Sequence, residues 1–170
     1  MKRIWLVAML ALAACADKSV IVAPDVPAAL RPPVGQTLHL EALATGVQIY
    51  ECSRKGDAAF EWAFKAPEAA LADRSGKSLG KHYAGPTWES IDGSTVVGQV
   101  AARDPGPTPS AIPWLLLSSK SNTGTGTFSA TKSIQRVTTT GGIAPASSCT
   151  AANLGEIARV PYTAAYYFYR

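Results

Sequence analysis

The feature that most constrains this fold is a series of short segments in which apolar and polar residues alternate, with turn signals between them. The clearest are residues 47–51 and 60–65, whose β-branched and aromatic side chains are typical of half-buried strands. Asp92-Gly93 is the strongest hairpin signal in the chain. About nine short strands, with turns every 8–12 residues or so, predict an all-β, single-domain antiparallel β-sandwich or barrel with little helix.

Two segments predict strands that are buried on both faces. Residues 114–117 are apolar without alternation, as in a central strand. The carboxyl-terminal strand would place one set of aromatic residues on each face: Tyr162, Tyr166 and Phe168 on one, Tyr167 and Tyr169 on the other. Burial of both faces explains this pattern better than a binding groove does. A proline-rich loop is expected at 104–113, and residues 151–158 are the only segment that favours a helix.

The amino terminus carries an export pattern. Two basic residues precede an apolar run to Ala14, which is too short for a membrane span and is typical of a secretory signal peptide. The ending Leu12-Ala13-Ala14-Cys15 resembles a lipobox, the cleavage signal of bacterial lipoproteins. That resemblance implies cleavage before Cys15 and acylation of its sulfur. Because Ala16 rather than Asp follows, it implies the outer membrane of a double-membrane bacterium, facing the periplasm or the cell surface.

The chain would then have three parts. Residues 1–14 form the signal peptide, residues 15–33 a proline-rich tether that starts at acylated Cys15, and residues 34–170 the β-domain. The membrane is therefore an expected partner through the lipid on Cys15. An ordinary signal cleaved near Ala14, which would leave a soluble secreted protein, is the alternative.

Cysteine arithmetic predicts one disulfide. With Cys15 acylated, Cys52 and Cys149 remain in a compartment that oxidises thiols, and we expect them to pair. No second Cys or His lies at ligand spacing from either, so a metal site built on them is disfavoured.

The charge balance argues against nucleic-acid binding. The 16 basic residues become 14 once the signal is removed, against 12 acidic ones, which leaves a net charge of about +2. The chain has no run of Lys and Arg and no stripe of basic and aromatic residues.

Seven segments together resemble a known family. They are residues 26–35, 46–52, 64–69, 80–89, 112–117, 134–137 and 166–169. In this order they resemble the exported domain-of-unknown-function family numbered 3455, over nearly the whole mature chain. The resemblance implies a single-domain exported protein. It implies no activity, substrate or catalytic residue.

His82 is the leading candidate for chemistry. Glycines and a proline restrict the backbone around it in residues 80–89, and it would act as a general base or metal ligand with help from Glu89. The commoner alternative is a strand-end histidine that hydrogen-bonds locally. A metal site would need the other histidine, His39, with Glu41 or Glu89, and is a minor hypothesis.

Aromatic residues supply the candidates for ligand binding. A cup for an apolar ligand or a sugar would be lined by Trp62, Trp88, Trp114, Tyr162, Tyr166 and Tyr167, although such residues more often belong to the core. Tyr83 is a further candidate. No Gly-x-Ser-x-Gly motif marks a nucleophile, and no cofactor is expected. The sequence therefore predicts a lipid-anchored envelope β-domain that binds an envelope ligand or protein. The alternative is an envelope enzyme that uses His82 as its acid-base or metal-binding residue.

Overall fold

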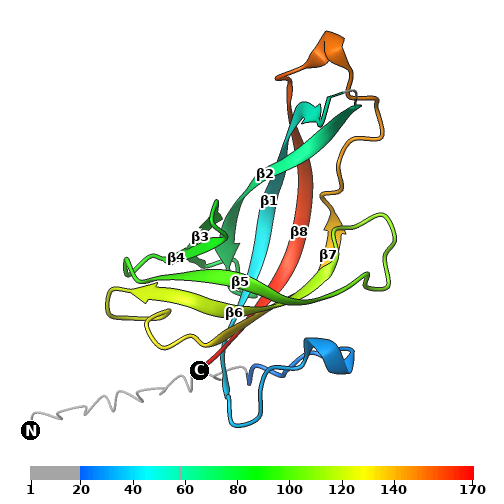
Figure 1. Ribbon diagram of the computed structural model, residues 1–170. Helices are drawn as coiled ribbons and strands as arrows, with labels where there is room; N and C mark the ends of the chain where they lie inside the picture. The colour runs from blue at the N-terminus through cyan, green and yellow to red at the C-terminus, as the bar shows by residue number, and fades with distance from the viewer. Residues whose placement is uncertain (1–19, 58) are drawn as a thin grey trace, which may run out of the picture.

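The computed structural model describes residues 20–57 and 59–170, and these residues form a closed antiparallel β-barrel (Figure 1). Each strand pairs with the next along the chain, and the last pairs with the first. The predicted signal peptide and Cys15 lie outside the described residues. The eight strands are β1 (Leu38–Lys55), β2 (Ala59–Ala72), β3 (Ser78–Tyr83), β4 (Thr87–Ser90), β5 (Thr95–Asp104), β6 (Trp114–Thr123), β7 (Ser133–Gly141) and β8 (Ile157–Tyr169).

The all-β prediction is confirmed, with eight strands in place of about nine. The difference comes from strand length, because β1 runs for 18 residues and β2 for 14 where shorter strands were expected. β1 continues through Gly46, where a Cβ would overlap the backbone oxygen of Glu68 on β2. Glycine therefore permits the close pairing of β1 and β2 at this point.

The barrel interior holds the main hydrophobic core, which strand alternation builds. Leu115 and Leu117 on β6 belong to this inner cluster, whereas Leu116 between them belongs to an outer one. β8 divides in the same way, with Tyr166 and Phe168 inside and Tyr167 outside. The two-sided burial predicted for both strands is confirmed.

The outer cluster is covered by the chain that precedes the barrel. The short 3-10 helix η1 (Ala28–Leu30) lies against β5 and β6, and it buries Leu30 completely in the outer cluster, where Val26 is also buried. The side-chain amide nitrogen of Gln135 donates to the carbonyl oxygen of Leu30 at 2.7 Å. Residues 26–30, which the sequence placed in the tether, are therefore packed on the barrel.

The predicted disulfide joins Cys52 of β1 to Cys149, with their Cα atoms 5.4 Å apart. It holds the chain between β7 and β8 against the projecting tip of β1 (Figure 1). The helix expected over residues 151–158 is shorter than predicted. It is one 3-10 turn, η2 (Ala151–Asn153), and Ile157 already pairs with Glu51 of β1. None of the helical segments in the described residues has the length and apolarity needed to cross a bilayer.

Candidate ligand-binding site

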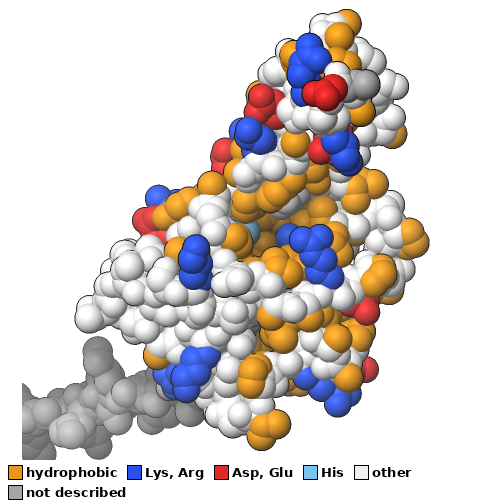
Figure 2. All heavy atoms as spheres, viewed as in Figure 1, with side chains coloured by type: hydrophobic (Ala, Val, Ile, Leu, Met, Phe, Trp, Pro, Cys, Tyr) orange, Lys and Arg blue, Asp and Glu red, His pale blue; other side chains and the backbone are white. Residues whose placement is uncertain are grey.

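A cavity of about 470 Å³ lies inside the barrel and opens through one side of its wall. The opening follows from strand length: β3 pairs with β2 only over Ala69–Ala72, so residues 60–67 of β2 pair with β1 alone among the described strands. Phe64 on β2 and Val100 on β5 line the cavity and are exposed, which places them at its rim. Figure 2 shows this face hollowed, with hydrophobic side chains in the hollow and basic side chains beside it.

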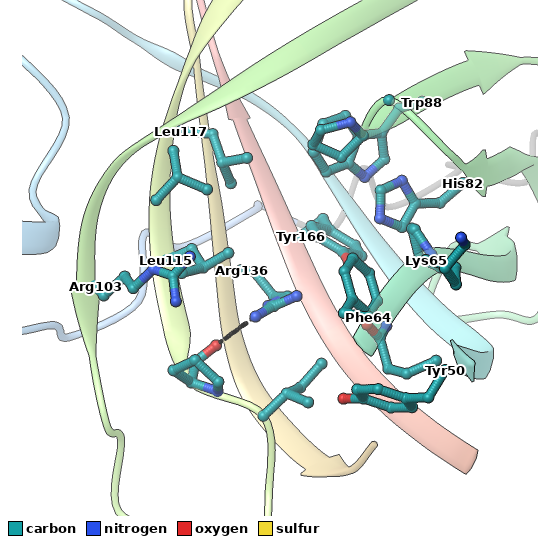
Figure 3. A pocket seen from close by; sticks show the side chains of 17 residues that line it. Tyr50, Phe64, Lys65, His82, Trp88, Arg103, Leu115, Leu117, Arg136 and Tyr166 are labelled. Carbon is teal, nitrogen blue, oxygen red and sulfur yellow. Dashed lines mark hydrogen bonds between the residues drawn. The ribbon is translucent and has the colours of Figure 1, made fainter. Parts of the chain in front are cut away.

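Three rings form the aromatic wall of the cavity. His82 and Trp88 are cross-strand partners on β3 and β4, and their rings stack with centroids 4.3 Å apart. Tyr166 of β8 meets both rings edge-on, at 5.1 Å from His82 and 5.3 Å from Trp88 (Figure 3). All three are buried, so they form a packed and mostly apolar wall.

His82 is held as a neutral imidazole. Its Nδ1 lies 2.8 Å from the carbonyl oxygen of Thr87, a pure acceptor, so Nδ1 carries the proton and donates. Burial is the main cause that lowers the pKa of His82 to about 3; the Thr87 bond opposes this shift, and the positive charge of Arg136 adds to it as a smaller cause. Near neutral pH the Nε2 atom is therefore a hydrogen-bond acceptor.

Several buried donors of the barrel interior lack a partner. The Gln48 amide nitrogen, the Trp88 indole nitrogen and the Tyr166 hydroxyl make no hydrogen bond to the described residues. The Tyr162 hydroxyl lies close to the Tyr166 hydroxyl and the Gln48 side chain, and the Tyr166 hydroxyl lies close to the Arg136 guanidinium, but none of these contacts has hydrogen-bond geometry. Buried polar groups are normally paired, and leaving one unpaired costs roughly 1–3 kcal/mol. Gln48, Trp88 and Tyr166 all line the cavity.

The cavity has a basic lining. Lys65, Arg103 and Arg136 are its three charged side chains, and none of its 17 lining residues is acidic. Lys65 forms an ion pair of 2.8 Å with Glu51, which offsets its charge. Arg136 donates from Nε and Nη2 to the carbonyl oxygen of Pro113, at 3.2 and 2.8 Å. Within the described residues neither arginine forms an ion pair.

Of the residues predicted for a site, the structure places His82, Trp88 and Tyr166 in the cavity and the others elsewhere. Glu89 accepts a hydrogen bond from Tyr83 at 2.8 Å and forms an ion pair with Lys81 at 3.2 Å, so the two predicted site residues Glu89 and Tyr83 bind each other. Trp114 packs against the outer cluster.

The proposed metal ligands are not brought together. His39 lies beside Thr131, with 3.4 Å between its Nε2 and the threonine hydroxyl. Glu41 is buried, where it accepts hydrogen bonds from Tyr167 at 2.6 Å and from Arg74 at 2.7 Å. The Arg74 bond holds the pKa of Glu41 below its usual value. No group of three or more His, Cys, Asp and Glu suited to a metal occurs in residues 20–57 and 59–170.

Sequence reasoning missed Gln48, Arg103 and Arg136. Each is a polar residue that faces inward, and a strand pattern shows which residues share a face but not which face closes onto the barrel interior. The one available signal was strand register: Gln48 shares its face with Tyr50, which also lines the cavity.

The fold and the site define a closed eight-stranded β-barrel with a half-open internal cavity. The family described as a protein of unknown function, DUF3455, matches residues 33–170, so the chain belongs to that family. No curated protein and no solved structure matches the chain.

Proposed function

We propose that this chain is a binding module of the cell envelope that holds a small molecule inside its barrel. The observation that carries the proposal is the cavity itself, which combines an apolar aromatic wall with the unpaired donors of Gln48, Trp88 and Tyr166. A ligand with acceptor atoms would pair these donors and bury its apolar body. Ligand sites are commonly concave, mostly apolar and about 300–1,000 Å³ in volume, with a few polar groups that fix orientation.

The enzyme hypothesis has less support from the same geometry. An acid-base residue works best with a pKa near the operating pH, whereas burial lowers the pKa of His82 to about 3. No carboxylate lines the cavity to activate the ring or share a metal with it. Binding therefore accounts for the arrangement better than proton transfer does.

The location is also part of the proposal. A disulfide at Cys52–Cys149 is consistent with an exported protein, because the cytosol keeps thiols reduced. We expect Cys15 to carry the lipid anchor, with residues 15–25 as the tether to the docked segment at Val26. A clickable palmitate analogue should label the full chain and a Ser19→Ala control in bacteria, but not a Cys15→Ser variant. Equal labelling of Cys15→Ser would contradict the anchor.

The binding proposal is tested with phenylnaphthylamine, a neutral apolar probe that fluoresces when it is removed from water. The mature chain, exported to the periplasm as a Cys15→Ser variant, should bind it saturably at one site. Val100→Trp fills the exposed rim of the cavity and should abolish binding. Ile91→Trp is the matched control, because Ile91 is exposed and lies outside the cavity lining.

Both tryptophan variants should unfold at the temperature of the parent, since neither Val100 nor Ile91 is buried. A parent protein that binds no probe, or a Val100→Trp variant that binds it unchanged, would overturn the proposal.

A further inference from the structure

The two arginines of the cavity, which form no ion pair with the described residues, belong to one row of residues across the barrel wall. Strand register aligns Arg103 of β5 with Leu115 of β6, Leu115 with Arg136 of β7, and Arg136 with Tyr166 of β8. All four line the cavity (Figure 3). Since neighbouring strands are about 4.8 Å apart, the backbones of the two arginines are separated by roughly 10 Å, with Leu115 between them. Two such side chains can reach one shared group.

Solvent exposure decreases along this row, from Arg103 to Tyr166. Arg103 is exposed, Arg136 is half-buried and Tyr166 is fully buried. The Pro113 carbonyl holds Arg136 through Nε and Nη2, which fixes the guanidinium in place and leaves Nη1 outside these two bonds. A fixed guanidinium loses little side-chain freedom when it binds an anion, and Nη1 is a charged donor that can bind an acidic group.

We propose that the ligand is an amphipathic anion, with one acidic group bound between Arg103 and Arg136 and an apolar body buried against Trp88 and Tyr166. The proposal rests on the proposed binding function and specifies the ligand class. Charge complementarity supports it, because the lining has three basic residues and no acidic one. The unpaired indole nitrogen of Trp88 and amide nitrogen of Gln48 are donors, which suit acceptor atoms on the ligand body.

The test compares two probes that share a ring system and differ in charge. Anilinonaphthalene sulfonate is anionic and phenylnaphthylamine is neutral. The mature Cys15→Ser chain should bind the sulfonate more tightly than the neutral probe. Added salt should weaken binding of the sulfonate but not binding of the neutral probe. Arg103→Gln should weaken sulfonate binding about tenfold, through loss of a charge-assisted hydrogen bond, and should weaken binding of the neutral probe much less.

Two further variants keep the result decisive. Arg31→Gln removes an exposed arginine at the end of η1, on the outside of the barrel, and should change neither affinity. Arg136→Gln should weaken sulfonate binding at least as much as Arg103→Gln does. Because it also loses the Pro113 bonds, its unfolding temperature is measured, and retained binding of the neutral probe shows that its cavity is intact.

The two proposals fail in different ways. Equal affinity for both probes, or sulfonate binding that neither arginine substitution changes, would overturn the anionic ligand while the binding function stands. A chain that binds neither probe would overturn the binding function itself. Tighter sulfonate binding that depends on both arginines would support the ligand class.

Discussion

The buried imidazole of His82 makes the stability of this protein depend on pH. In the unfolded chain His82 takes up a proton near its ordinary pKa of 6.5, but in the folded barrel only near pH 3. Between these two pH values the unfolded state binds more protons than the folded state. The contribution of His82 to the free energy of unfolding therefore has its full value above pH 6.5 and decreases as the pH drops. The full loss, reached below about pH 3, is of the order of 5 kcal/mol. NMR titration should show no protonation of the His82 ring from pH 8 to pH 4.

A control separates His82 from the second histidine. Burial, and to a lesser extent Arg170, also lowers the pKa of His39, so both contribute in the same direction. His82→Phe should make the dependence of unfolding free energy on pH between 6.5 and 4.5 shallower than in the parent. In His39→Gln, the part of this pH dependence that is due to His82 should remain. A His82 signal that titrates near pH 6.5 would contradict the buried, neutral ring.

At the scale of elements, the docked segment around η1 is what allows β8 to be apolar on both faces. Leu30 is completely buried on the outer cluster with Tyr167 and Tyr169. Truncating a buried leucine costs about 2–5 kcal/mol, so Leu30→Ala should lower the free energy of unfolding by an amount in that range. Urea denaturation measures it. Val34→Ala, at a fully exposed position four residues on, should change it by less than about 0.5 kcal/mol.

Local patterns predicted the elements better than their assembly. The faces of β8 and the Asp92-Gly93 turn followed from alternation and turn chemistry, which depend on neighbours in sequence. The length of β1 did not follow from local patterns, because β1 pairs with β2 and β8 over most of its length. The inward arginines and the docking of Leu30 depend on closure of the barrel, which brings together residues more than 100 positions apart, as in the Gln135–Leu30 bond. Of the cavity residues, the sequence therefore predicted only His82, Trp88 and Tyr166.

At the scale of the whole molecule, the Cys52–Cys149 disulfide encloses more than half of the chain in one covalent loop. Cys52 and Cys149 are 97 residues apart, and the chain-entropy account assigns a loop of that size roughly 4–5 kcal/mol of stabilisation. The double variant Cys52→Ser and Cys149→Ser, made in the mature Cys15→Ser chain, should lose most of that free energy in urea denaturation. Dithiothreitol should destabilise the parent to a similar extent and leave the double variant unchanged, which assigns the effect to this bridge. If the reduced parent were as stable as the oxidised one, the stability of the barrel would not depend on the disulfide. The disulfide would then give no reason for this protein to need an oxidising compartment.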